Sequence, residues 1–280
     1  MKAADCSSLF AETQLATLDD EDSPEAQIIF RGPEQIYLPV EGDTYYSVYD
    51  GETTTLETGI MPCNGPMDDI YDWSAVSIKN STVFKIKNFG SGSDYWLMKD
   101  FDSSNTNCAP TAATNVLWYW GLKRGCNRVL YSSVVSGQMG YERKAKKMHD
   151  ILYKGMNTDP EEGTEPQNVL NGFEAFFGSR DTKIWNYAEY YQNKETNNYI
   201  LNTDFIQALN DHCPMHLAVY VRNEENAFKW NGHATMAFGY AYSTSNEFYV
   251  FVMDGIHNYG RFVWPKAYPR IYGRKIWVAS

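Results

Sequence analysis

The sequence lacks an apolar run long enough to cross a membrane, and its first residues lack the apolar centre of a signal peptide. A transmembrane helix needs about 20 consecutive apolar residues, so we predict no membrane span. The opening stretch, MKAADCSSLFAETQ, is small and polar instead. We therefore expect either a cytoplasmic protein or one from which a targeting segment has been removed.

Positive charge is scarce in residues 1–95, which hold 5 Lys and Arg against 17 Asp and Glu, a net charge of −12. The whole chain of 280 residues carries −11, so residues 96–280 carry +1. A nucleic-acid surface needs a stripe of basic residues, and this charge distribution argues against nucleic acid as a partner. The asymmetry also indicates two units with different roles.

Cysteine is rare, and no two of the five cysteines have the C-x-x-C spacing of a zinc site. We therefore expect no metal and no other cofactor. An odd number leaves at least one free thiol, while disulfides among the others stay open. The cysteines are Cys6, Cys63, Cys108, Cys126 and Cys213.

The N-terminal part predicts an acidic tail over residues 1–26 and a small β-rich unit over residues 27–95. The tail has no hydrophobic periodicity. The unit contains short runs of β-branched and aromatic residues punctuated by Gly, Pro, Asn and Asp. These runs are QIIF, QIYLPV, TYYSVY, SAVSI and TVFKIKNF. We place the domain boundary between residues 95 and 96.

After residue 96 the pattern becomes helical. Apolar residues recur at helical spacing over residues 109–120, Pro110 suits a first turn, and Gly121 suits a helix end. We predict a buried helix there with Cys108 at its N-terminus. Further helices are predicted for ERKAKKMHDILYKG, EPQNVLNGFEAFFG and TDFIQALNDH, the last capped by Thr203.

The C-terminal part predicts a sheet. Five apolar stretches with strand character follow the helices, namely HLAVYVRN, HATMAFGYAY, EFYVFVMD, GRFVWP and KIWVAS. Helices first and an antiparallel sheet last are typical of an α+β fold.

Cys108 is the first candidate for chemistry. It lies in NTNCAPTAATNVLWYWG, among polar residues at a predicted helix start, whereas buried structural cysteines usually lie inside apolar runs. The positive end of the helix dipole favours a thiolate at this position. A thiolate that acts as a nucleophile in acyl transfer also needs a base and a group that orients the base.

The sequence has five histidines, and His233 is the best candidate for that base. It follows Gly232 and leads a strand too apolar to lie at the surface, although a structural role is the more common one for such a residue. The other four have ordinary explanations: a surface helix for His149, a helix end for His212, a strand start for His216 and a turn for His257.

Asp254 is the candidate orienting group. It ends the strand after His233, 21 residues later, and adjacent antiparallel strands can bring the two side chains together. A carboxylate there could fix the tautomer of the imidazole and stabilise its charged form. The alternative is an ordinary turn aspartate in a D-G pair.

The ordered set Cys108, His233 and Asp254 resembles the papain-like cysteine peptidases. The resemblance is closest to their bacterial, mostly secreted branches: the streptopains, the staphopains and the proteins similar to double-glycine leader peptidases. NCAPTAATNVLWYW resembles the nucleophile helix C-G-P-[TS]-A-A, with Ala109 in place of Gly. DFIQALNDHCPMHLAVYV, NGHATMAFGYAY and VMDG resemble the segments around the other two positions.

The resemblance implies a papain-like fold over residues 96–280, with Cys108 as nucleophile, His233 as general base and acid, and Asp254 as orienting residue. It also implies a polypeptide substrate and a secreted or cell-surface protein. One oxyanion donor would be the N–H of Cys108. The family's second donor is a Gln about six residues earlier, where this chain has Asp102, so Asn105 or Asn107 would have to replace it.

The resemblance implies that the acidic N-terminal segment is a propeptide that blocks the substrate groove of the peptidase. The alternative is a permanent accessory domain. Two other functions stay open. One is amide hydrolysis or acyl transfer on a non-protein substrate. The other is an inactive papain-like protein that binds a partner, because Asp102 would repel an oxyanion.

Overall fold

The computed structural model describes residues 76–101, 106–130, 139–178, 184–222 and 230–279, together with five short strands between Ile29 and Tyr71. The chain divides into two compact units, Met1–Gly59 and Ile60–Ser280. Within the described residues, no helix is both long enough and apolar enough to cross a bilayer.

The first unit contains a four-stranded antiparallel sheet in the order β1-β2-β3-β4. Each strand pairs with the next along the chain, so the sheet is a meander. Three of the predicted runs, QIIF, QIYLPV and TYYSVY, overlap its first three strands. The strands are β1 (Ile29–Gly32), β2 (Gln35–Glu41), β3 (Thr44–Ser47) and β4 (Thr53–Thr55).

The second unit begins at Ile60, well before the predicted boundary at residues 95 and 96. Strand β5 (Ile70–Tyr71) pairs with β11, and β6 (Phe84–Lys85) pairs with β9. These short strands satisfy backbone groups of the larger sheet and therefore belong to it. The expected strand SAVSI contributes only a single bridge, between Ile78 and Ser243, among its described residues.

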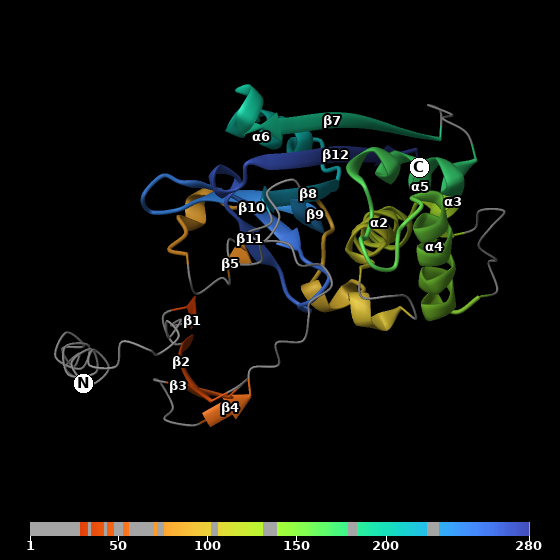
Figure 1. Ribbon diagram of the computed structural model, residues 1–280. Coiled ribbons are helices and arrows are strands. Elements are labelled where there is room, and N and C mark those ends of the chain that lie inside the picture. Colours follow the sequence, from red (N-terminus) through yellow and green to blue (C-terminus); the bar gives the residue numbers. More distant parts are fainter. Residues whose placement is uncertain are drawn as a thin grey trace, which may run out of the picture. The chain divides into compact units, whose positions relative to one another are not determined.

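The second unit is built on an eight-stranded antiparallel sheet in the order β5-β11-β10-β9-β8-β12-β7, with β6 alongside β9 (Figure 1). The last strand of the chain, β12, lies between β8 and β7 and pairs with both. The longer strands are β7 (Trp185–Asn193), β8 (Met215–Arg222), β9 (Trp230–Tyr242), β10 (Phe248–Met253), β11 (Arg261–Val263) and β12 (Arg270–Val278).

Both faces of this sheet are buried. In β10, Phe251 and Met253 join the core that faces the helices, whereas Val250 and Val252 join a second core that includes Phe205 of α6. Side chains alternate between the faces of a strand, so a strand covered on both sides must be apolar throughout. This explains why FYVFVM lacks the polar alternation of a half-exposed strand.

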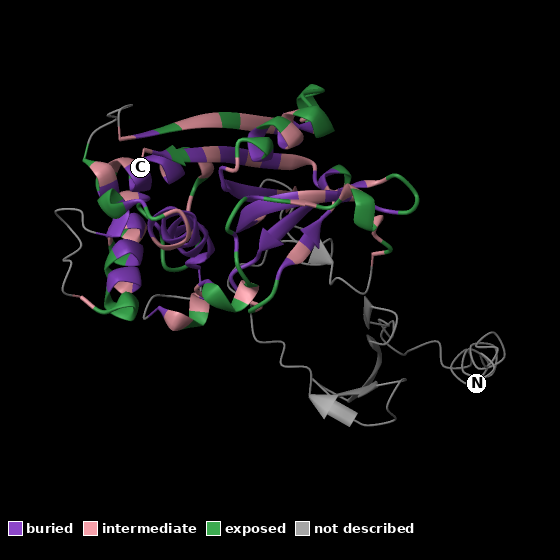
Figure 2. Cartoon of the chain, turned by 180° about the vertical axis from the view of Figure 1, so that it is seen from behind, coloured by how far each residue is buried: buried purple, intermediate pink, exposed green. Residues whose placement is uncertain are grey.

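The helices precede most of the sheet, and α2 is buried along its whole length. Figure 1 shows α2 to α5 gathered at one side of the sheet, and Figure 2 shows the buried α2 beside the buried central strands. The α+β order predicted from the sequence is therefore confirmed. The helices are α2 (Cys108–Trp118), α3 (Asn127–Leu130), α4 (Tyr141–Gly155), α5 (Val169–Phe177) and α6 (Asn202–Asn210).

Two local predictions were wrong, and one strand was missed. The helix does not stop at Gly121, because a π-helical turn, η5 (Tyr119–Lys123), continues it; a Cβ at Gly121 would lie 2.8 Å from Cγ of Leu130. Thr203 does not cap α6, because the helix starts at Asn202 and the Asp204 carboxylate accepts the N–H of Leu201 instead. Strand β7 was not predicted at all.

In the part of the chain that the structure describes, six short 3₁₀ turns connect these elements. Of these, η4 (Met98–Asp100) lies on the segment that leads to α2. The others are η2 (Asn80–Thr82), η3 (Gly92–Asp94), η6 (Pro166–Asn168), η7 (Lys194–Thr196) and η8 (Pro265–Ala267).

Candidate active site

Cys108 is the first residue of α2, as predicted, and is 9% exposed. Ala112 and Ala113, one turn on, are buried, and their small side chains let the helix pack closely against β8 and β9. Asn107, the residue before the cysteine, is the N-cap. The thiol therefore lies at the positive end of a buried helix and near the surface.

His233 lies in β9 opposite Val219 of β8, and it is 1% exposed. Its Nε2 is 2.7 Å from the main-chain carbonyl oxygen of Asp254. A carbonyl oxygen only accepts hydrogen bonds, so Nε2 carries the hydrogen and Nδ1 is the basic nitrogen. Nδ1 is buried without a nitrogen or oxygen partner.

The Cys108 thiol is the side-chain partner of His233. Burial by itself lowers the pKa of His233. The hydrogen bond and charge of Cys108, the charge of Asp254 and the Asp254 carbonyl together outweigh burial and raise this pKa above the ordinary 6.5. An imidazole with a raised pKa next to a thiol favours a thiolate and an imidazolium. The structure thus brings two of the three predicted residues into direct interaction.

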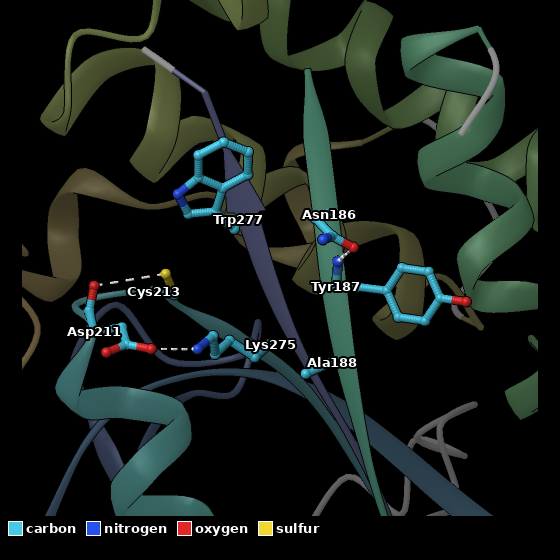
Figure 3. A pocket seen from close by; sticks show the side chains of 7 residues that line it. All are labelled: Asn186, Tyr187, Ala188, Asp211, Cys213, Lys275 and Trp277. Carbon is cyan, nitrogen blue, oxygen red and sulfur yellow. Dashed lines mark hydrogen bonds and ion pairs between the residues drawn. The ribbon is translucent and has the colours of Figure 1, made fainter. Parts of the chain in front are cut away.

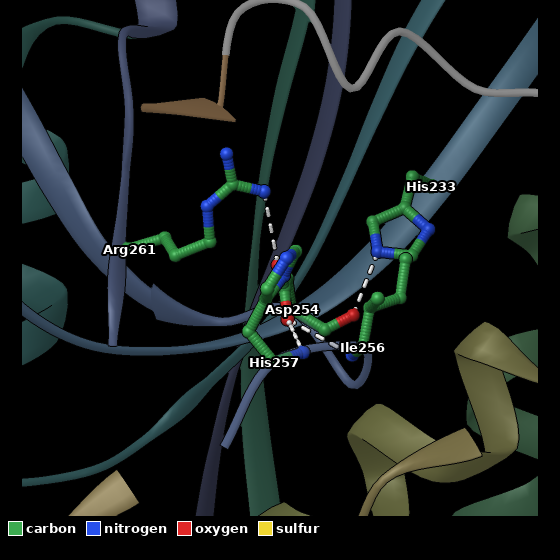
Figure 4. A network of polar contacts seen from close by, with 5 residues as sticks. All are labelled: His233, Asp254, Ile256, His257 and Arg261. Atoms are coloured by element: carbon green, nitrogen blue, oxygen red, sulfur yellow. Dashed lines mark hydrogen bonds and ion pairs between the residues drawn. The ribbon is translucent and has the colours of Figure 1, made fainter. Parts of the chain in front are cut away.

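Asp254 reaches His233 in a way that differs from the prediction. Its carbonyl oxygen contacts the imidazole, while its side chain is turned toward the loop that follows β10 and toward β11 (Figure 4). The carboxylate accepts the backbone N–H groups of Ile256 (2.9 Å) and His257 (2.8 Å) at Oδ1. Its Oδ2 contacts Nδ1 of His257 (2.7 Å) and Nη1 of Arg261 (3.2 Å).

The Asp254 carboxylate is charged throughout the neutral and mildly acidic range. Burial by itself raises the pKa of this fully buried group. The side chain of His257 and the two backbone N–H groups more than offset that effect and lower the pKa to about 2. A buried carboxylate with this many donors is stable as an anion.

A chain of hydrogen bonds links the cysteine end of the site to the histidine end. The Asn107 amide donates to the Met98 carbonyl (3.2 Å), and the Met98 N–H donates to the Gly255 carbonyl (2.7 Å). Gly255 follows Asp254 and has φ +76°, a conformation that only glycine adopts readily. The turn that holds His233 is therefore fixed to the segment that precedes Cys108.

Asn115, about two helical turns beyond that cysteine, holds the same segment in place. Its Oδ1 accepts the N–H of Trp96 (2.8 Å), and its Nδ2 donates to the carbonyl of Trp96 (2.9 Å). Asn115 is fully buried, so these backbone groups take the place of water. Sequence reasoning missed this residue. A polar residue on an apolar helix face can be recognised in the sequence, but the backbone groups that it binds cannot.

Of the predicted oxyanion donors, only Asn107 lies within the described residues; Asp102 and Asn105 lie outside them. Asn107 is 1% exposed and its amide contacts Met98. Its observed hydrogen bond is thus a structural one. The role of all three residues stays a prediction.

Two of the other described histidines, His149 and His216, are structural. His149 was expected at the surface, but it is 1% exposed and stacks on Phe101 at 3.9 Å, because its face of α4 turns toward the core. His216 lies at the start of β8, as predicted, and its Nε2 contacts the carbonyl of Ala109 at 3.2 Å. Burial lowers the pKa of each to about 3, so both are neutral.

Among the described residues, Cys108, Cys126 and Cys213 are not joined in a disulfide. Burial raises the pKa of Cys126, and it raises that of Cys213 to about 11. Neither thiol is therefore activated, in contrast to the environment of Cys108. Cys6 and Cys63 lie outside the described residues.

A separate pocket of about 590 Å³ lies at the outer strand β7 and its neighbour β12 (Figure 3). Its walls carry an ion pair between Lys275 and Asp211 at 2.5 Å and the half-exposed ring of Trp277. The thiol of Cys213 also lines it, and the raised pKa of this thiol keeps it protonated. None of the predicted catalytic residues lines this pocket.

No group of His, Cys, Asp and Glu side chains suited to a metal ion occurs among the described residues.

Comparison with known proteins assigns the family. Residues 94–268 match the Peptidase_C39 like family. The chain belongs to this family. It thereby falls in the papain-like cysteine peptidase clan, as the sequence motifs indicated. No curated protein matches the chain.

The Peptidase_C39 like region contains Cys108, His233 and Asp254, and it ends after Arg261, within the sheet unit. A solved structure of active wild-type interpain A cysteine protease from Prevotella intermedia is similar at 12% identity. That similarity covers 71% of this chain and 98% of the other, with a TM-score of 0.43.

Proposed function

We propose that this protein is a cysteine peptidase in which Cys108 and His233 cleave a peptide bond. The observation that carries the proposal is the interaction of a thiol at a helix N-terminus with a buried imidazole whose pKa is raised. Membership of a peptidase family supports peptide bonds as the substrate. We propose a polypeptide substrate outside the cell or on its surface, as the resemblance predicts.

The proposed reaction has two halves. Nδ1 of His233 takes the proton of Cys108, and the thiolate attacks the carbonyl carbon of the scissile bond. The imidazolium then gives the proton to the leaving amine, the C–N bond breaks, and a thioester remains on Cys108. In the second half, His233 takes a proton from water, the hydroxide displaces the thiolate, and a carboxylic acid leaves.

The oxyanion of each tetrahedral intermediate needs hydrogen-bond donors. The N–H of Cys108 points out of the first turn of α2 and is one donor, because the first four N–H groups of a helix lack helical partners. We keep the side chains at positions 105 and 107 as the candidates for the second.

We further propose that the acidic first unit is a propeptide. The unequal charge of the two parts and the compactness of residues 1–59 support this proposal. Cleavage near residue 95 would remove β5 and β6 and expose backbone groups of β11 and β9. We therefore place the cleavage between Gly59 and Ile70.

The first experiment tests the reactivity of Cys108. The protein is treated briefly with substoichiometric iodoacetamide at about pH 6, where ordinary thiols with a pKa near 8.5 are almost fully protonated. Peptide mapping by mass spectrometry then locates the label. We expect it on Cys108 ahead of Cys126 and Cys213, because burial raises the pKa of both of the other two.

His233→Ala is the partner variant and should remove this selectivity, since the imidazolium would no longer stabilise the thiolate. His149→Phe is the matched control, because His149 is buried but lies apart from Cys108 in α4; it should leave the labelling unchanged. Equal labelling of the cysteines in the wild type would overturn the catalytic proposal and favour a papain-like binding protein.

A further inference from the structure

The Asp254 carboxylate has no acceptor site left for His233. An ionised carboxylate offers about four lone-pair positions. Here they are occupied by two backbone N–H groups, the His257 ring and the Arg261 guanidinium. The main-chain oxygen of Asp254 is the group that contacts Nε2 of His233 instead (Figure 4).

Arg261 anchors this arrangement to the sheet. It is the first residue of β11 and lies opposite Val252 of β10, two residues before Asp254. Its side chain is 12% exposed and the Asp254 side chain is 0% exposed, so their ion pair is shielded from water. The other partner, His257, lies in the loop and its side chain is 34% exposed. Arg261 is therefore the more rigid of the two contacts.

We propose that Arg261 is a positioning residue of the peptidase reaction: by holding the Asp254 carboxylate, it fixes the main-chain carbonyl of Asp254 that orients His233. This inference rests on the proposed function and deepens it. It also moves the orienting role from the aspartate side chain, where the sequence places it, to the aspartate backbone.

Arg261 has an electrostatic consequence that a purely structural residue would not have. The charged and titratable groups around the imidazole are Cys108 from α2, Asp254 and His257 from the loop after β10, and Arg261 from β11. Without Arg261, the Asp254 anion loses a counter-charge and stabilises the imidazolium more strongly. The pKa of His233 then rises further, and activity that needs the imidazolium persists to higher pH.

The test compares Arg261→Gln, Arg261→Lys and Arg270→Gln in the full chain. Arg270 is the matched control, because it pairs with Glu195 at 3.1 Å in the same sheet, away from the site. For each protein, kcat and KM are measured from pH 5 to 10, together with thermal unfolding and the selectivity of Cys108 labelling at about pH 6.

We expect Arg261→Gln to lower kcat by roughly 10- to 100-fold with little change in KM, since misplacement of a reacting group by about 1 Å has effects of this size. The alkaline limb of its pH–kcat profile should move to higher pH. Arg261→Lys keeps the charge and should restore most of kcat and the wild-type limb. Arg270→Gln should match the wild type.

Two failures can be told apart. If the wild type neither hydrolyses peptides nor shows selective labelling of Cys108, the proposed function fails and this inference fails with it. If the wild type is active and Arg261→Gln has the same kcat and the same alkaline limb, only the positioning role is wrong. If Arg261→Gln unfolds at a lower temperature than the wild type, the folded Arg261→Lys variant replaces it in the test. A shift in the alkaline limb of its pH–kcat profile, despite the retained charge, would contradict the proposal.

Discussion

Two buried histidines make the stability of this protein depend on pH. His149 and His216 have pKa values lowered to about 3 by burial, and Arg274 adds to the effect at His216. Each takes up a proton more readily in the unfolded chain, where its pKa is about 6.5. Their contribution to stability is therefore complete above pH 6.5 and is lost as the pH falls from there toward 3.

We predict that the free energy of unfolding falls by about 2 kcal/mol per histidine between pH 7 and pH 5. The raised pKa of His233 acts in the opposite direction and offsets part of this loss. Urea unfolding at the two pH values measures the difference. His149→Phe keeps the ring stacked on Phe101 and should remove about half of the pH dependence. An unchanged pH dependence in this variant would show that His149 is not the group that titrates.

Sequence reasoning singled out Cys108 and His233, the proposed nucleophile and base, because each has a local signal. Cys108 interrupts a polar stretch at a helix start, and His233 follows a glycine at the head of an apolar strand. Arg261 has no such signal, since an arginine at a strand start is ordinary. The orienting atom was also out of reach, because a sequence names a side chain but not which atom of Asp254 faces the imidazole.

Helices α4 and α5 pack closely because glycines lie where they meet. A Cβ on Gly155 would lie 2.6 Å from Cβ of Ala175 and 3.0 Å from Cα of Gly172. One of these atoms is backbone, so it cannot move aside easily. The two helices cover the core next to α2, and their contact therefore supports the nucleophile helix.

We predict that Gly155→Ala destabilises the protein by about 1–2 kcal/mol. Alanine favours a helix over glycine by about 1 kcal/mol in its interior, and overpacking costs about 1–3 kcal/mol. Gly155 ends α4, so the helix gain is small there and the steric cost dominates. Urea unfolding checks the sign. Lys154→Ala, an exposed neighbour, should change the free energy by less than about 0.5 kcal/mol; a more stable Gly155→Ala variant would contradict the close packing.

The long elements could be predicted from hydrophobic spacing, whereas the short ones could not. The helices at Tyr141–Gly155 and Val169–Phe177 and the strands at Met215–Arg222 and Phe248–Met253 overlap their predicted ranges. Strand β7 escaped because its polar and tyrosine-rich residues are mostly not fully buried, as an outer strand allows. The two-residue strand β5 exists only through its pairing with β11, which no local pattern reveals, whereas β6 lies within the predicted run TVFKIKNF.

The two units of the chain differ in charge, and this difference motivates the last prediction. If the first unit is a propeptide, the purified full chain should lose it during activation. Intact-mass measurements over time should then find a product that starts between Gly59 and Ile70, together with a rise in peptidase activity. Cys108→Ala is the control and should stay full-length if the cleavage is autocatalytic. Full activity of the uncleaved chain would favour an accessory domain instead.

The domain boundary shows how far composition can be trusted. The change in charge predicted two units with a boundary at residues 95 and 96, whereas the two compact units divide between Gly59 and Ile60. Those of residues 70–95 that the structure describes form only short elements. They join the sheet through β5, β6 and the Met98 segment next to them. Which unit these residues belong to depends on their pairing with distant strands and not on their own β-propensity.

The place of β12 in the sheet has a consequence for biosynthesis. Strand β7 pairs with β12, and β12 also pairs with β8, so the strand made last lies between two made earlier. During synthesis on the ribosome, β7 cannot pair with β12 until β12 has emerged. The sheet that supports His233 is therefore completed only after Arg270–Val278 has emerged, and a nascent chain that already displays the thiol of Cys108 cannot yet hold the proposed site in its final form.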